Sequence, residues 1–222
     1  KIISWDACHV KAGITLPCNE LGARMSPSEL PPIRRIVTGH DAQGRSCIVE
    51  DGPCTSIRTV PERPRYRSVN VWRTTEAPAQ VDAPDSIAQH QGILPPGQGG
   101  TILRIIDIPP ESKDPVERQR QISAMFKGMF ADAHHDARQG VHPGMHKTLT
   151  VDYALVLQGE IYALMDEGET LMKAGDVAAM PADIAHQGFS KKRSMLLVWE
   201  NGSPSLVYEI QKGESPEVPV QF

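Results

Sequence analysis

The chain has 222 residues, a formal net charge of −4 and 40% hydrophobic residues. This length suits one large domain, or two small ones, with a buried core. A membrane-spanning helix would need a run of about 18 apolar residues, and the chain has none. It also has no block rich in Lys and Arg of the kind that binds nucleic acid or anionic lipid. We therefore expect a globular protein with no nucleic acid and no membrane as partner.

The four cysteines lie in the first quarter of the chain and include no Cys-x-x-Cys pair. A thiolate zinc site is therefore not indicated. Reduced thiols are the simpler interpretation, and they fit a cytoplasmic protein, whereas a disulfide such as Cys8–Cys18 would require secretion. Residues 1–32 are interpreted as an N-terminal extension of uncertain role.

The first half of the chain predicts strands separated by turns and one long loop. Gly and Asp at 39–44 indicate a hairpin loop. Residues 75–100 are rich in Pro, Gly, Ala and Gln and indicate the long loop. The expected strands are 33–39, 46–49, 68–73 and 101–108, the last of which is ended by a Pro-Pro pair.

One helix is expected over 114–132. Asp114 can cap it, and Pro115 suits its first turn. Ile122, Met125, Phe126 and Met129 then recur at helical spacing, which predicts a face that packs against the core.

The last third predicts five short strands with turn residues between them. Short strands at this spacing are typical of a sandwich or a barrel. The fold class is therefore all-β, and the expected strands are 150–157, 160–165, 169–172, 177–180 and 194–200.

Two motifs in this region resemble those of the cupin superfamily. Gly140, His146, Asp152 and Gly159 have the spacing of the first cupin motif. Thr148 occupies the place of its second His, and Asp152 that of its Glu. The second motif is matched by Gly175, Pro181, Asp183, His186 and Ser190, with Asp183 in place of Gly and Ser190 in place of Asn.

The resemblance implies a cupin-type jelly-roll β-barrel with extra N-terminal strands and one or two short helices. It further implies a single domain over 33–222, with leading strands and a loop at 33–113, the helix at 114–132 and the motifs at 140–200. Many single cupins are dimers, so a homodimer is expected. Small cupins of this kind act on small aromatic or polyketide molecules in natural-product and aromatic metabolism.

Alternation along a strand predicts which side chains share the barrel interior. His146 and Thr148 point the same way, Asp152 can join them, and Tyr153 faces away. His186 is expected to enter from a neighbouring strand. His142, in the loop before the motif, is expected at the surface, although it could instead close over the barrel mouth.

Two chemistries fit His146, Asp152 and His186. The three could hold one divalent Fe, Mn or Zn for a dioxygenase or decarboxylase. Thr148 is a poor metal ligand and Asp152 is shorter than the usual Glu, so both departures count against a tight metal site.

The second chemistry needs no metal. A histidine can act as acid or base near neutral pH. Asp152 could orient His146 or His186, or it could stay protonated in an apolar barrel and act as the acid. We favour this alternative, a lyase, isomerase or cyclase, because the missing ligand belongs to the centre of the first motif. A non-catalytic binding barrel is a third hypothesis.

Four further residues are candidates for substrate binding. Thr148 and Gln187 lie beside the predicted catalytic residues in the sequence. Trp199 could stack on a flat substrate. Arg104 lies in the middle of an apolar strand, where an unpaired charge would be costly. It therefore either faces solvent or points into the cavity to hold a carboxylate or phenolate.

Overall fold

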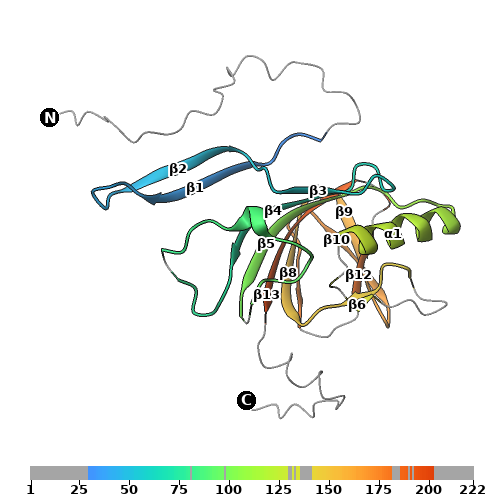
Figure 1. Cartoon of the computed structure of the whole chain (residues 1–222). Coiled ribbons are helices and arrows are strands. Elements are labelled where there is room, and N and C mark those ends of the chain that lie inside the picture. The colour runs from blue at the N-terminus through green and yellow to red at the C-terminus, as the bar shows by residue number, and fades with distance from the viewer. Residues whose placement is uncertain are drawn as a thin grey trace, which may run out of the picture. The chain divides into compact units, whose positions relative to one another are not determined.

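The computed structural model describes residues 30–80, 82–97, 99–129, 132, 134–135, 142–181, 186–189, 191 and 193–202. These residues belong to two compact units, which divide between Thr55 and Ser56 (Figure 1). The predicted single domain over 33–222 and the role assigned to 1–32 stay predictions.

The described part of the first unit is an antiparallel hairpin of β1 (Arg34–His40) and β2 (Ser46–Pro53), close to the predicted strands. Its turn is held by Asp41, whose side chain accepts the backbone N–H groups of Gln43 and Arg45, each at 2.9 Å. Local bonding of this kind is why Asp favours turns. Cys47, on β2, and Cys54, after it, form no disulfide.

The second unit contains a six-stranded antiparallel sheet in the order β11-β8-β13-β5-β4-β3. Four of its strands have eight or nine residues. The only one that the sequence did not predict is β3, which is too short to show an alternating pattern. The bounds are β3 (Ile57–Thr59), β4 (Arg67–Thr74), β5 (Thr101–Ile108), β8 (Thr150–Gln158), β11 (Val177–Met180) and β13 (Ser194–Gly202).

A five-stranded antiparallel sheet in the order β10-β9-β12-β7-β6 completes this unit. The sequence predicted β9 and β10 but not the other three, which have only two to four residues each. The bounds are β6 (His134–His135), β7 (His146–Lys147), β9 (Glu160–Met165), β10 (Glu169–Lys173) and β12 (His186–Phe189).

Helix α1 (Pro115–Met129) confirms the predicted helix. The Asp114 carboxylate accepts the backbone N–H of Val116 at 2.9 Å, which is the expected N-cap bond. A short 3₁₀ helix, η1 (Ile87–Gln89), interrupts the long loop before β5. No helix among the described residues has the length and apolar character needed to cross a membrane.

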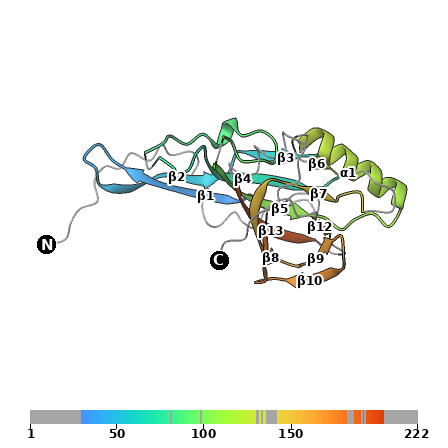
Figure 2. The ribbon, with the colours of Figure 1, turned by 90° about the horizontal axis from the view of Figure 1, so that it is seen from below.

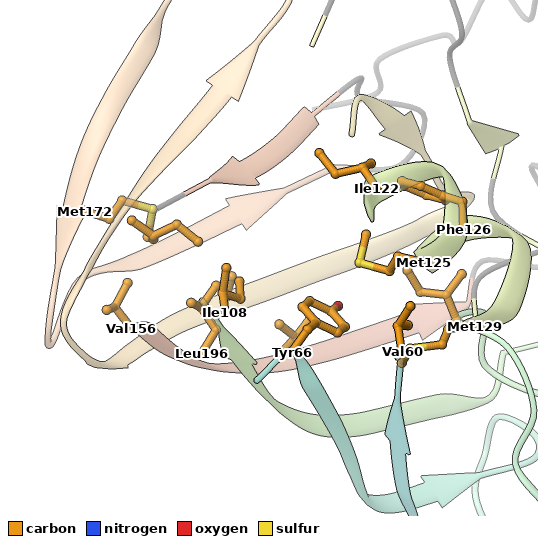
Figure 3. Close-up of a cluster of buried hydrophobic side chains, with 14 residues drawn as sticks. Val60, Tyr66, Ile108, Ile122, Met125, Phe126, Met129, Val156, Met172 and Leu196 are labelled. Carbon is orange, nitrogen blue, oxygen red and sulfur yellow. The ribbon is translucent and has the colours of Figure 1, made fainter. Parts of the chain in front are cut away.

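The hydrophobic core of the second unit joins α1 to both sheets. The four predicted helix residues are buried, and Figure 3 shows them on one side of the cluster, with Met172 of β10 on the other. In Figure 2, α1 and the β9–β10 hairpin lie at opposite ends of this unit. Apolar side chains from α1 and the two sheets therefore enclose a common interior.

Two motif glycines form turns that bound this interior. Gly159, between β8 and β9, and Gly175, before β11, have φ values of 81° and 97°. Other residues rarely adopt such values. A Cβ on Gly159 would also lie 2.5 Å from the carbonyl oxygen of Arg193. The resemblance at Gly159 thus has a steric cause.

A buried carboxylate links β4 and β5 to the start of β13. Asp107 is fully buried and accepts bonds from Arg67 at 2.6 and 2.8 Å and from Arg193 at 2.7 Å. Two cations around one buried carboxylate compensate its loss of hydration. The network fixes the edge of the six-stranded sheet at the end of β5.

Candidate functional site

A cavity of about 130 Å³ lies between the two sheets of the second unit. It is comparable to a cavity of roughly 150 Å³ that holds a benzene molecule. Its lining is mostly apolar and includes Met125 and Phe126 of α1. Its ionisable members, leaving the two tyrosines aside, are Arg63, His146, Asp152 and His186.

His146 and His186 meet on the wall of this cavity. They are directly opposite each other on β7 and β12, and their ring centroids are 4.6 Å apart. Cross-strand neighbours necessarily bring their side chains together. The structure thus confirms that these two imidazoles, far apart in the sequence, share one pocket.

His146 is oriented by two contacts. Its Nδ1 lies 2.8 Å from the carbonyl oxygen of Gly144, and its ring meets the edge of Phe126 with centroids 5.4 Å apart. A carbonyl oxygen can only accept a hydrogen bond, so this Nδ1 carries the proton. In the neutral ring the lone pair is then on Nε2.

Asp152, on β8, lines the same cavity and is buried. Its Oδ2 accepts a bond from the Thr148 hydroxyl at 3.3 Å, while its Oδ1 has no hydrogen-bond partner among the described residues. Burial raises the pKa of this carboxyl above 3.8, and the Thr150 hydroxyl, His186 and other neighbours only partly oppose it. The acid form of Asp152 therefore persists to a higher pH than in an exposed aspartate.

The predicted alternation is seen around Asp152. Tyr153 is 44% exposed and faces away, as expected. Thr148 comes after β7 and is buried, and its hydroxyl accepts a bond from Thr150 at 2.8 Å. It does not line the cavity. Thr148 therefore supports Asp152 from behind, and its predicted contact with substrate stays untested.

Arg104 is buried, which removes the solvent-facing alternative. It shares a face of β5 with Ile106 and Ile108, which line the cavity, but it does not line the cavity itself. Its guanidinium donates to the carbonyl of Ile93 in the long loop. Burial and the positive charge of Arg104 lower the pKa of His90, in the same loop, to about 4.

The other two substrate-binding candidates have different outcomes. Gln187, on β12, is buried and lines the cavity, and its amide donates to the carbonyl of Gly188 at 2.8 Å. The backbone of Trp199 belongs to β13, but its side chain lies outside the part of the structure that is described. Asp183 and Ser190 of the second motif are also outside it.

Three polar residues near the cavity were missed by the sequence analysis. Arg63 is buried and lines the cavity; its guanidinium lies over Tyr66. Glu111 lies 3.9 Å from Arg63 and 2.9 Å from His142. His142 is thus largely buried rather than at the surface. No spacing or motif connects these residues in the sequence, so only their contacts identify them.

Among the described residues, no three His, Cys, Asp or Glu side chains gather closely enough to hold a metal ion. His146 and His186 are close to each other and could supply two nitrogen ligands. The full predicted set of His146, Asp152 and His186 is not found as a ligand cluster, and its role in metal binding stays a prediction.

Comparison with known proteins gives several fungal relatives. A phomopsin biosynthesis cluster protein of Diaporthe leptostromiformis is 29% identical over 70% of this chain and 71% of its own. A cupin-domain-containing oxidoreductase of Hypocrea virens is 24% identical over 71% of this chain and 68% of its own. Another from Aspergillus ruber is 23% identical over 69% of this chain and 62% of its own.

No model of a known protein family matches the chain. Solved structures with a similar arrangement include an RmlC-like cupin from Shewanella frigidimarina, 9% identical, with a TM-score of 0.38 over 69% of this chain and 88% of that one. So distant a likeness says nothing about activity.

The sequence relatives and the strand arrangement confirm the resemblance to the cupin superfamily. The all-β fold class is confirmed as well, since two antiparallel sheets enclose the cavity and one α-helix is described.

Proposed function

We propose that the protein is a small-molecule enzyme of natural-product biosynthesis that catalyses proton transfer in a lyase, isomerase or cyclase reaction. The observation that carries the proposal is the contact between His146 and His186 at 4.6 Å, on an apolar cavity that also holds Asp152. The names of the fungal relatives, which include two biosynthesis cluster proteins, support the metabolic context.

The proposed chemistry follows from the two kinds of ionisable group. A neutral imidazole takes a proton from a carbon acid, such as the carbon next to a carbonyl. The raised pKa of Asp152 suits it to give a proton to a departing hydroxyl. The C–H and C–O bonds break, a C=C bond forms, and water leaves. Returning the proton to another carbon, without loss of water, would instead be an isomerisation.

The apolar wall supports this assignment of roles. Around His146 and His186 the lining is dominated by Met, Ile, Leu, Val and Ala side chains. Such surroundings exclude water and strengthen interactions with developing charge. The size of the cavity suits a compact molecule or one ring of a larger aromatic or polyketide substrate.

Proton abstraction can be tested before the substrate is known. We would incubate the protein in D₂O with a panel of aromatic and polyketide ketones and follow deuterium incorporation beside the carbonyl by mass spectrometry. His146→Ala and His186→Ala should each lower the exchange rate at least ~100-fold. Tyr153→Phe, on the outward face of β8, is the matched control and should exchange at the wild-type rate. Equal exchange by all four proteins would remove the proposal.

A metal-dependent oxidoreductase is the second candidate, favoured by the names of two relatives. His146 and His186 would then be two ligands, and the metal would activate oxygen or polarise the substrate. Elemental analysis and activity after chelation separate the candidates. Stoichiometric iron or manganese, with activity lost on chelation, would favour the oxidoreductase. Full activity in chelated protein would favour the lyase.

We also propose a homodimer. The outward face of the six-stranded sheet carries exposed Tyr153, Leu157 and Val177 on the adjacent strands β8 and β11. Contiguous apolar surface of this kind is typical of association sites. Light scattering coupled to gel filtration should give twice the chain mass, and Val177→Lys should shift the protein toward the monomer. A monomeric wild-type protein would contradict this proposal.

A further inference from the structure

A tight turn delivers His146 to the cavity. It spans His142 to Met145, with the backbone N–H of Met145 donating to the carbonyl of His142 at 3.0 Å. Pro143 occupies the second position, where proline favours a turn. Gly144 is packed against Gln187 so closely that a Cβ would lie 2.5 Å from its amide carbon. The turn is therefore held between its own hydrogen bond and a wall of the cavity.

His142 holds this turn with both of its ring nitrogens. Nδ1 accepts the backbone N–H of Gly144 at 3.1 Å, so Nδ1 carries no proton in this arrangement. The ring proton is then on Nε2, which donates to the Glu111 carboxylate at 2.9 Å. The carboxylate and the backbone together select one tautomer of His142.

The peptide group of residue 144 passes this selection on to the cavity. Its N–H is bound by His142, and its carbonyl oxygen accepts the Nδ1–H of His146 at 2.8 Å. The direction of that carbonyl thus depends on the His142 bond. A rotated carbonyl would no longer hold the proton on Nδ1 of His146.

The far end of the series is fixed in the protein interior. Glu111 has a side chain only 9% exposed, and the buried guanidinium of Arg63 lies 3.9 Å from it. Arg63 is itself held over the ring of Tyr66, with 4.9 Å to its centroid, and against the sulfur of Met125 at 3.4 Å. A carboxylate so enclosed is a stiff partner for His142, since water cannot easily replace the bond.

We propose that Glu111 and His142 are positioning residues for His146. They hold its ring with Nδ1 protonated and the lone pair on Nε2, at the opposite edge of the ring. His146 then enters a reaction as a proton acceptor rather than a donor. The assignment of a reaction to His146 rests on the proposed function, whereas the tautomer does not.

Nitrogen-15 NMR of the histidine rings tests the tautomer without any substrate. In the full-length wild-type protein at pH 7.5, His146 should show a proton on Nδ1 and a lone pair on Nε2. His142→Ala should lower the fraction of that tautomer by at least about twofold, because nothing would then fix the peptide of residue 144. Glu111→Ala should act in the same direction.

Conservative variants separate positioning from a loss of structure. Glu111→Gln keeps an oxygen that can accept the His142 bond and should retain the wild-type tautomer. His142→Asn keeps an acceptor for the Gly144 N–H, as Asn does in turns, and should restore most of what His142→Ala loses. Glu117→Ala, which removes an exposed carboxylate on α1, should change nothing. Melting curves identify any variant that does not fold.

Two results would overturn the proposal. One is a wild-type His146 with its proton on Nε2. The other is an unchanged His146 spectrum in folded His142→Ala and Glu111→Ala proteins. In the deuterium-exchange assay, the two Ala variants should lower the rate about 10-fold, a typical effect of removing an orienting partner. An altered tautomer with no exchange activity in the wild type would sink the proposed function but leave the positioning intact.

Discussion

The two sheets of the second unit differ in what they contribute. The six-stranded sheet has long strands in continuous register and a fully buried ion-paired aspartate at its edge. The five-stranded sheet has strands of two to six residues, and it carries both histidines of the cavity. Long strands supply many backbone bonds and much buried surface, whereas short ones can place a few side chains accurately. We infer that stability depends more on the first sheet and chemistry more on the second.

The largest expected effect on stability lies in the six-stranded sheet. Asp107→Ala leaves Arg67 and Arg193 without their buried partner, which should cost about 3–5 kcal/mol in the free energy of unfolding. Urea denaturation measures this. The control is Asp51→Ala in the hairpin, where the pair with Arg34 is exposed and its loss should have little effect. Similar losses in both variants would contradict a dominant role for Asp107.

The converse is expected in the five-stranded sheet. His186→Ala should reduce turnover about 100-fold, equivalent to roughly 2.7 kcal/mol in activation free energy, while the urea midpoint stays near the wild-type value. The imidazole lies at a cavity, so removing it opens no new void in a packed core. Loss of stability on the scale of Asp107→Ala would erase the distinction between the sheets.

A pH effect should report on the loop that packs on the six-stranded sheet. The pKa of His90 is lowered to about 4 in the folded protein, against 6.5 in the unfolded chain. The unfolded state therefore binds a proton first as the pH falls below 6.5, and stability is lost until about pH 4. At pH 5.5 the loss should be about 1 kcal/mol. His90→Gln should lack this part of the pH dependence in denaturation curves.

Asp152 should show the opposite and smaller trend. Its folded pKa is raised, so the unfolded chain ionises first as the pH rises through 3.8, and stability declines above that value. Asp152→Asn should therefore unfold at higher denaturant concentration than wild type at pH 7, but not at pH 3. It should also lower activity. A less stable Asp152→Asn protein at pH 7 would show that the carboxylate is better solvated than its burial indicates.

The accuracy of the sequence predictions follows the same division. Strands such as β5 and β8 alternate over eight or nine residues, which is long enough for the pattern to appear in the sequence. Strands β7 and β12 are too short for any pattern. Their histidines were found through the motif resemblance, not through periodicity. The helix was predictable because its cap and its apolar face agree.

The network behind His146 could not be predicted. Glu111 and His142 are separated by a helix and a loop, and Arg63 lies on a different segment again. Each is a polar residue that would ordinarily be expected at the surface. Their hydrogen bonds depend on how α1 and the turn at His142 pack together, which no local pattern encodes.

The sequence by itself determined the all-β class, the helix, most long strands and the pair of histidines. These features depend on local spacing, on glycine at restricted backbone angles and on recognisable motifs. Only the tertiary structure decided that Arg104 is buried, that Thr148 supports Asp152 and that His142 binds Glu111. The physical reason is that hydrogen bonding and burial of polar groups are set by neighbours from distant segments, which meet only after the sheets have packed.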